Sequence, residues 1–151
     1  MLKQAFFSFL TALGLSSAEA HEDTHHPFEA FLDSFIPEVA EKATQLNKAF
    51  WILETTGNED AASLVASLTL ELSLLFQSDT TYNKLIEWQK DPKITDPLTQ
   101  RQLQTLIFSF KANAAPKQWL KDIAEKEAKL SLAYANFRST LEGKEQTEND
   151  I

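Results

Sequence analysis

Residues 37–57 read PEVAEKATQLNKAFWILETTG, and this stretch decides the fold. Its apolar residues follow one another in alternating steps of four and three: Val39, Ala43, Leu46, Phe50 and Leu53. Because an α-helix turns once in about 3.6 residues, this spacing places all these side chains on one helical face. Proline suits the first helical position and glycine the position after the last. The sequence therefore predicts an amphipathic helix that begins at Pro37 and ends before Gly57.

Helical patterns continue on both sides of this stretch. Upstream, residues 28–36 predict a short helix that Pro37 ends. Downstream, Asn58 is expected to cap a helix with a leucine stripe, and Asp79 to cap a shorter helix. Asp96-Pro97, a capping residue followed by proline, predicts the start of a further helix.

A last long helix is predicted to begin at Pro116, with Gly143 as its cap. Its apolar stripe again follows steps of three and four: Leu120, Ile123, Glu127, Leu130, Tyr134, Phe137 and Leu141. We expect Glu127 at the edge of this stripe and Ala124 and Ala128 facing inward. A buried Glu127 paired with Arg101 or Arg138 is the alternative.

The three tryptophans, Trp51, Trp88 and Trp119, are expected in the core together with Phe50. No segment alternates apolar and polar residues over a strand length. The predicted fold class is therefore all-α, with about five antiparallel amphipathic helices in a helical bundle or lid-like arrangement.

Composition excludes several kinds of function. The chain has 151 residues, no cysteine, three glycines and a formal net charge of -8. Without cysteine there are no disulfides, zinc–thiolate sites, iron–sulfur clusters or thiol nucleophiles. The negative charge disfavours nucleic acid as a partner, because phosphate binding needs clustered lysine and arginine.

Residues 1–20 have the features of a secretory signal peptide. A short basic start is followed by an apolar run over residues 5–15, and Ala18 and Ala20 stand in the A-x-A arrangement of a cleavage site. We expect cleavage after Ala20, a periplasmic or secreted protein, and no membrane association afterwards. An ordinary buried N-terminal helix is the alternative.

The search for chemistry yields one weak pattern. His21 to His25 match H-E-x-x-H, the motif of zinc peptidases. That chemistry needs both histidines on one face of a stable helix, and here they lie in a polar leader that runs into His26 and Pro27. We therefore predict no catalytic, cofactor-binding or metal-binding residues in this chain. Weak metal binding by the leader stays open.

Three segments resemble the N-terminal region of secreted helical zinc peptidases related to peptidyl-dipeptidase A (angiotensin-converting enzyme) and the oligopeptidases. Residues 46–59, LNKAFWILETTGNE, resemble a helix with an N-K-A-x-W-like segment followed by T-T-G. Residues 96–103, DPLTQRQL, resemble a D-P-L-x-x-R-Q-L segment, and residues 137–145, FRSTLEGKE, an F-R-x-x-x-x-G-K segment. The three stand in the same order and at compatible spacing over residues 35–151.

The resemblance implies a lid or rim over a peptide channel, with zinc only in a catalytic region further along. Peptides would be substrates once that region completes the protein, and none of the family's catalytic residues has a match here. The alternative function is a standalone exported helical-bundle protein, without enzymatic activity, that binds a protein partner through an apolar helix face.

The expected domain organisation follows from these readings. Residues 1–20 are the signal peptide, 21–34 a polar histidine-rich leader with a short helix, and 35–143 the helical domain. Residues 144–151 are expected to start a further helix that this chain lacks, because Thr147 and Asp150 resemble a capping pair.

Overall fold

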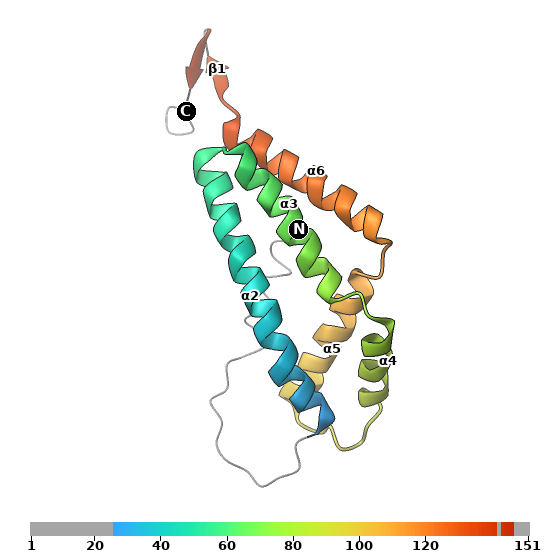
Figure 1. Ribbon diagram of the computed structural model, residues 1–151. Helices are drawn as coiled ribbons and strands as arrows, with labels where there is room; N and C mark the ends of the chain where they lie inside the picture. Colours follow the sequence, from blue (N-terminus) through green and yellow to red (C-terminus); the bar gives the residue numbers. More distant parts are fainter. Residues whose placement is uncertain (1–25, 142, 147–151) are drawn as a thin grey trace. The chain divides into compact units, whose positions relative to one another are not determined.

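The computed structural model describes residues 26–141 and 143–146, and these are predominantly helical (Figure 1). The helices are α2 (Pro27–Thr56), α3 (Glu59–Leu75), α4 (Asp79–Trp88), α5 (Pro97–Ala112) and α6 (Lys117–Asn136). Two short antiparallel strands follow, β1 (Ser139–Leu141) and β2 (Lys144–Gln146), with Thr140 opposite Glu145. The all-α prediction is confirmed.

The turn between α2 and α3 follows the predicted capping. Gly57 has a φ of +60°, and its N–H donates to the Leu53 carbonyl oxygen at 2.9 Å. The Asn58 side chain then accepts a hydrogen bond from the N–H of Ala61 at 2.8 Å. These two contacts satisfy backbone groups at the facing helix ends, which have no partner within their own helices.

The N-cap residue of α5 is the predicted one, whereas that of α4 is the residue before the predicted one. Asp96 Oδ2 accepts from the N–H of Thr99 at 2.7 Å, and Pro97 is the first residue of α5, as predicted. At α4 the cap is Ser78 rather than the predicted Asp79, because the Ser78 hydroxyl accepts from the N–H of Thr81. Asp79 is instead an acidic residue in the first turn, where the helix dipole favours it.

Pro37 does not divide the chain as predicted. Residues 28–36 and the segment after Pro37 form one continuous helix, α2. Phe35 and Val39, on either side of the proline, are both buried, whereas Pro37 itself is exposed. We attribute the continuity to this packing, since the exposed ring leaves the unpaired carbonyl group of the preceding turn accessible to water.

The last helix ends earlier than predicted. α6 stops at Asn136, and Gly143, with a φ of +79°, lies between β1 and β2 instead of capping a helix. Residues 144–146, where we expected a further helix to start, form β2. The predicted helix start over residues 147–151 lies outside the described residues.

The described residues form two compact units. The first contains residues 26–41 and Ser73–Ala115, and the second contains Lys42–Leu72 and the described residues from Pro116 to residue 146. Two of the three boundaries between the units therefore fall inside helices, α2 and α3, and the third lies between α5 and α6. The expected helical domain over residues 35–143 stays a prediction.

The first unit has an aromatic core. The Phe35 ring lies 5.4 Å from that of Phe76 and 5.9 Å from that of Phe110. Trp88 packs on Phe28, with the ring centroids 5.6 Å apart, and is half-buried. Aliphatic residues of α4, α5 and the turn between them complete this core: Leu85, Ile94, Leu103, Leu106 and Ile107.

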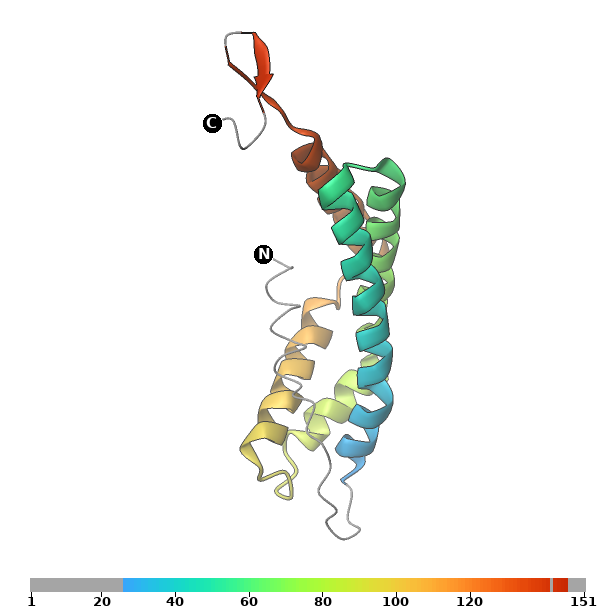
Figure 2. The same ribbon diagram turned by 90° about the vertical axis from the view of Figure 1, so that its left-hand side faces the viewer.

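The second unit contains the end of α2, most of α3, and α6, which lie together in Figures 1 and 2. Its core is built largely from small and aliphatic side chains: Ala43, Leu46, Ala49, Leu53, Ala61, Ala62, Val65, Leu68, Leu72, Ala124 and Ala128. At the surface of this unit Lys42 forms an ion pair with Glu71, whose pKa is lowered by that hydrogen bond.

Candidate functional site

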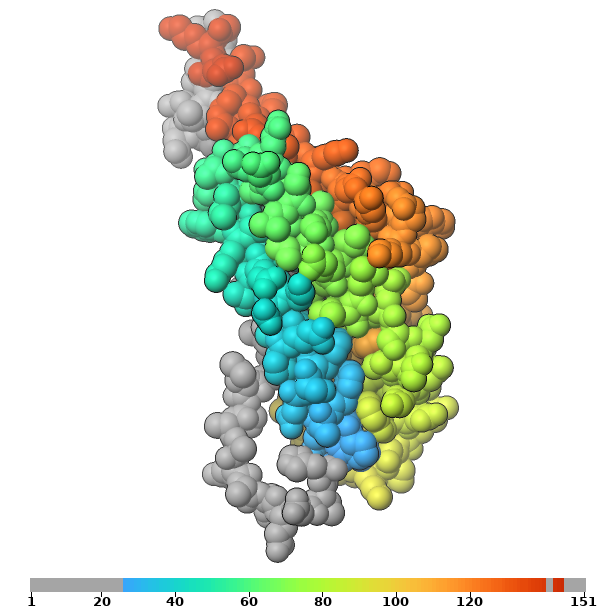
Figure 3. Space-filling model, viewed as in Figure 1, coloured from blue at the N-terminus to red at the C-terminus, as the bar shows by residue number. Residues whose placement is uncertain are grey.

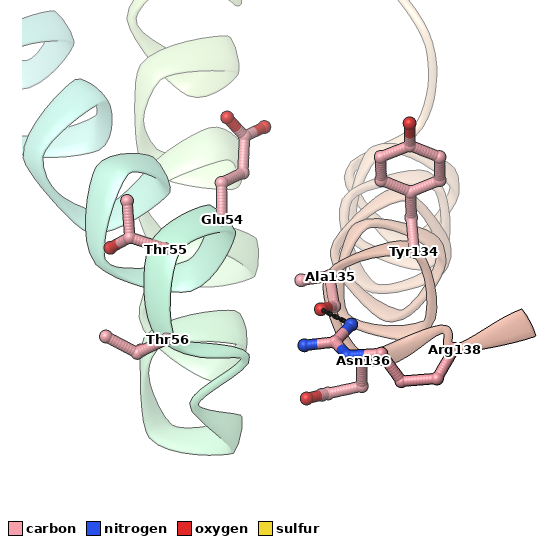
Figure 4. Close-up of a pocket in the computed structure, with 7 residues that line it drawn as sticks. All are labelled: Glu54, Thr55, Thr56, Tyr134, Ala135, Asn136 and Arg138. Carbon is pink, nitrogen blue, oxygen red and sulfur yellow. Dashed lines mark hydrogen bonds between the residues drawn. The ribbon is translucent and has the colours of Figure 1, made fainter. Parts of the chain in front are cut away.

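A cavity of the second unit lies where the ends of α2 and α6 meet (Figure 4). It has a volume of about 450 Å³, which is within the usual range of small-ligand sites. The last turn of each helix and the residue before β1 supply its lining: Glu54, Thr55, Thr56, Tyr134, Ala135, Asn136 and Arg138.

Hydrogen bonds to the backbone hold the walls of this cavity in place. The hydroxyl of Thr55 donates to the carbonyl oxygen of Trp51 at 2.7 Å, and that of Thr56 donates to Ile52 at 2.6 Å. Both hydroxyls therefore bond back to carbonyl oxygens one turn earlier in α2. The Asn136 side chain donates to the Gly57 carbonyl oxygen at 3.0 Å and joins the end of α6 to the turn after α2.

Arg138 is the residue of the cavity best suited to a ligand. Its Nη1 donates to the carbonyl oxygens of Ala135 and Phe137, at 3.1 and 2.7 Å. A guanidinium has five N–H donors, so others remain for a carboxylate or phosphate group. Tyr134 and Glu54 stand on facing helices at the same cavity (Figure 4). The arrangement can bind a small polar group, and its lining contains no histidine to act as a base.

A second polar contact lies in the first unit, at the start of α2. The His26 ring accepts from the N–H of Phe28 through Nδ1 at 3.0 Å, and its Nε2 lies 3.2 Å from Asp91 Oδ2. The Lys93 N–H and then the His26 ring hold the pKa of Asp91 below its ordinary value. This arrangement corresponds to a helix cap, because both ring nitrogens are used in fixing the start of α2.

α6 exposes the apolar stripe that we predicted to be its core side. Leu130 is 72% exposed and Tyr134 74% exposed, whereas Ala124 and Ala128 are buried. We call the residues Leu120, Ile123, Glu127, Leu130 and Tyr134 the α6 face. Its prediction as a core face is wrong, and only the inward position of the two alanines is confirmed.

Small residues explain which side of α6 packs. Ala124 and Ala128 stand four apart and let the backbone of α6 approach its neighbours closely, which large side chains would prevent. In the sequence, the only indication of this packing side is the spacing of the two alanines. The large side chains of the α6 face indicate the other side. Trp51 and Trp119, also predicted as core, are likewise exposed, at 71% and 65%.

Glu127 is exposed too, so the alternative of a buried carboxylate paired with Arg101 or Arg138 is wrong. Figure 3 shows α6, in orange, at the surface of the second unit beside α3, in green.

No family model, no curated protein and no solved structure matches this chain. The relationship to zinc peptidases therefore stays a prediction from the three segments. Two of those segments contribute to the cavity. Residues 46–59 supply Thr55 and Thr56, and residues 137–145 supply Arg138. The third segment, residues 96–103, forms the start of α5 in the first unit.

The part of the chain that the structure describes contains no candidate metal site. There, no group of three or more histidine, aspartate or glutamate side chains could hold a metal ion. The H-E-x-x-H pattern at residues 21–25 lies outside the described residues, as does the predicted signal peptide.

The described helices differ from membrane spans in length or in hydropathy. Over residues 26–141 and 143–146, no single helix has the length and apolar character needed to cross a bilayer. Only α3 and α4 taken together reach the required length and composition.

Proposed function

We propose that this chain is the non-catalytic N-terminal helical part of an exported zinc peptidase, similar to peptidyl-dipeptidase A and the oligopeptidases. In that protein it would form part of a lid or rim beside the peptide channel. Zinc and the residues that activate water would come from further polypeptide. The order and spacing of the three resembling segments support this relationship.

The observation that carries the proposal is the exposed α6 face. A self-contained helical bundle buries its largest apolar side chains, and contiguous exposed apolar patches mark surfaces that contact something else. Here Leu130 and Tyr134 are among the most exposed large side chains of the described residues. This is the pattern expected of a helical part that packs against further polypeptide.

The deciding experiment is to read the coding DNA beyond the codon for Ile151. The proposal expects an in-frame or frameshifted continuation that encodes H-E-x-x-H on a predicted helix. Unrelated sequence would count decisively against it. A matched biochemical check is hydrolysis of fluorogenic peptides, which we expect from the completed protein and not from this chain.

A standalone exported binding protein is the second candidate. It is favoured by the filled cores of both units and by the absence, within residues 26–141 and 143–146, of buried side-chain nitrogen or oxygen atoms without a hydrogen bond. Light scattering of the purified chain separates the two proposals. An evolved bundle gives a monodisperse monomer or a symmetric oligomer, whereas an uncovered lid aggregates.

A further inference from the structure

The α6 face has the spacing of a coiled-coil seam. From Leu120 the steps to Ile123, Glu127, Leu130 and Tyr134 are three, four, three and four residues. Alternation of three and four is the pattern by which one helix receives the side chains of another. Within its own unit α6 packs instead through Ala124 and Ala128, so the seam is exposed from Ile123 to Tyr134, and Leu120 at its start is half-buried.

The spacing indicates a helix as the occupant. A sheet edge would require a period of two, and an irregular segment would require no periodicity at all. All positions of the face except Glu127 are apolar or aromatic, so the occupant must present an apolar stripe of its own. The face therefore fits an amphipathic helix.

Glu127 determines the charge of that helix. It lies at the centre of the face, with two apolar positions before it and two after it. Docking a helix would remove water from its carboxylate, and an unpaired buried charge is strongly unfavourable. The nearest positive charge in sequence, Lys126, lies at the edge of the face, where an ion pair contributes little because it stays in water. A cation opposite Glu127 must therefore come from the occupant.

The same central position argues against a second copy of this chain. When two α6 faces pair in parallel register, Glu127 meets the Glu127 of the other copy. When they pair in antiparallel orientation, its carboxylate meets an apolar position of the other copy and is buried without a cation. The net charge of -8 adds a further repulsion between copies and an attraction for a basic partner.

We infer that the α6 face binds one amphipathic helix that carries lysine or arginine at the core position opposite Glu127. This holds whether or not the chain belongs to a peptidase, since it depends only on the spacing, exposure and charge of α6.

The test uses the full chain and two synthetic helical peptides of about three heptads. Each has five core positions, with leucine at the outer four and either lysine or glutamate at the centre. The peptides share the three-and-four spacing of the α6 face, so the central charged residue lies opposite Glu127 in parallel register. Binding is measured by fluorescence anisotropy of the labelled peptides, and the free peptides are checked for self-association.

We expect the lysine peptide to bind at least about tenfold more tightly than the glutamate peptide. Glu127→Lys should reverse this preference. Glu125→Lys makes the same change in net charge away from the seam and should retain the original preference. Leu130→Asp should abolish binding of both peptides while the circular dichroism spectrum stays helical.

Several outcomes would overturn the inference. One is equal affinity for the two peptides, and another is no binding of either. A third is a defined, symmetric dimer of the full chain that Leu130→Asp abolishes, which would make a second copy the occupant. A fourth is binding to anionic phospholipid vesicles that the same substitution abolishes, which would make the occupant a membrane surface.

Discussion

At the turn between α2 and α3, both the backbone conformation and the neighbouring atoms restrict which residue can stand at position 57. Gly57 adopts a left-handed φ that side chains with a Cβ rarely take, and a Cβ at this position would lie 2.1 Å from Asn136 Oδ1. Two constraints therefore coincide at one position. Gly143 shares the first constraint but not the second, because a Cβ there would have no neighbouring atom within 4 Å.

Gly57→Ala is expected to destabilise the protein by about 1–2 kcal/mol. The left-handed conformation costs roughly 1 kcal/mol, and the Asn136 side chain must move away from the new Cβ and give up its hydrogen bond to the Gly57 carbonyl oxygen. Gly143→Ala, the matched control, should show only the conformational cost. The free energy of unfolding in urea measures both. The double change Gly57→Ala/Asn136→Ala should recover the steric part, and equal effects of the two glycine substitutions would contradict the clash.

The Asp96 cap predicts a pH dependence. Hydrogen bonds from the Thr99 N–H and hydroxyl lower the pKa of Asp96, so the folded protein holds its proton less tightly than the unfolded chain does. Its contribution to stability is then fully present above the unfolded pKa of about 4. It is lost as the pH falls through the lower folded value.

The control for this prediction is Asp96→Asn, which can cap α5 without titrating. Unfolding is followed in urea between neutral pH and acid. Relative to the Asn variant, the wild-type chain should lose stability as the pH falls below about 4. Parallel curves for the two proteins would show that the cap does not depend on the charge.

The bounds of a helix could be predicted where a capping residue alone determines them. They could not be predicted where a local preference is opposed by tertiary packing. Caps at Asn58 and Asp96 act within a few residues, so the starts of α3 and α5 could be predicted. Pro37 carries a strong local signal for a helix end, yet burial of its neighbours keeps α2 continuous. Tertiary packing overrides local propensity at that position.

Pro37→Ala tests this account of α2. A proline inside a helix removes a backbone hydrogen bond, and here the ring is exposed and fills no core. We expect the substitution to raise the free energy of unfolding by about 1 kcal/mol or more. Pro37→Gly is the control and should gain less, because glycine is a poor helix former. A loss of stability in Pro37→Ala would mean that the proline helps to position the start of α2.

The packing side of α6 can be tested in the same way. Ala128→Leu adds volume to a buried site and should destabilise the second unit by about 1–3 kcal/mol. Leu130→Ala, on the exposed side, should change stability by about 0.5 kcal/mol or less. Thermal and urea unfolding measure both variants. A larger loss of stability in Leu130→Ala than in Ala128→Leu would place the α6 face in the core.

At the scale of the whole molecule, two units with different cores share the long helices. One unit is stabilised by stacked and edge-on aromatic rings, and the other by alanine, leucine and valine packed at short range. The cavity between Thr55, Tyr134 and Arg138 belongs to the second unit, as does the α6 face. Every surface proposed here to bind another molecule therefore lies in that unit.

The exposed face also predicts how the isolated chain behaves. It should bind a hydrophobic fluorescent dye in its folded state. Replacing Leu130 and Tyr134 by serine should reduce dye binding without lowering helicity. The matched control replaces the buried pair Ala124 and Ala128 by serine, which should reduce stability instead of dye binding. Dye binding that the first change leaves unaltered would place the apolar surface elsewhere.

The helical character of the protein, and the starts of most of its helices, could be predicted from the sequence alone. Those properties depend on periodicity and on capping groups only a few residues apart, which a single chain displays directly. Only the tertiary structure decided which side of α6 packs, that Pro37 lies within a helix, and that Thr55, Tyr134 and Arg138 share a cavity. These depend on how closely distant backbones approach, and small buried residues such as Ala128 control that distance without standing out in a hydrophobic pattern.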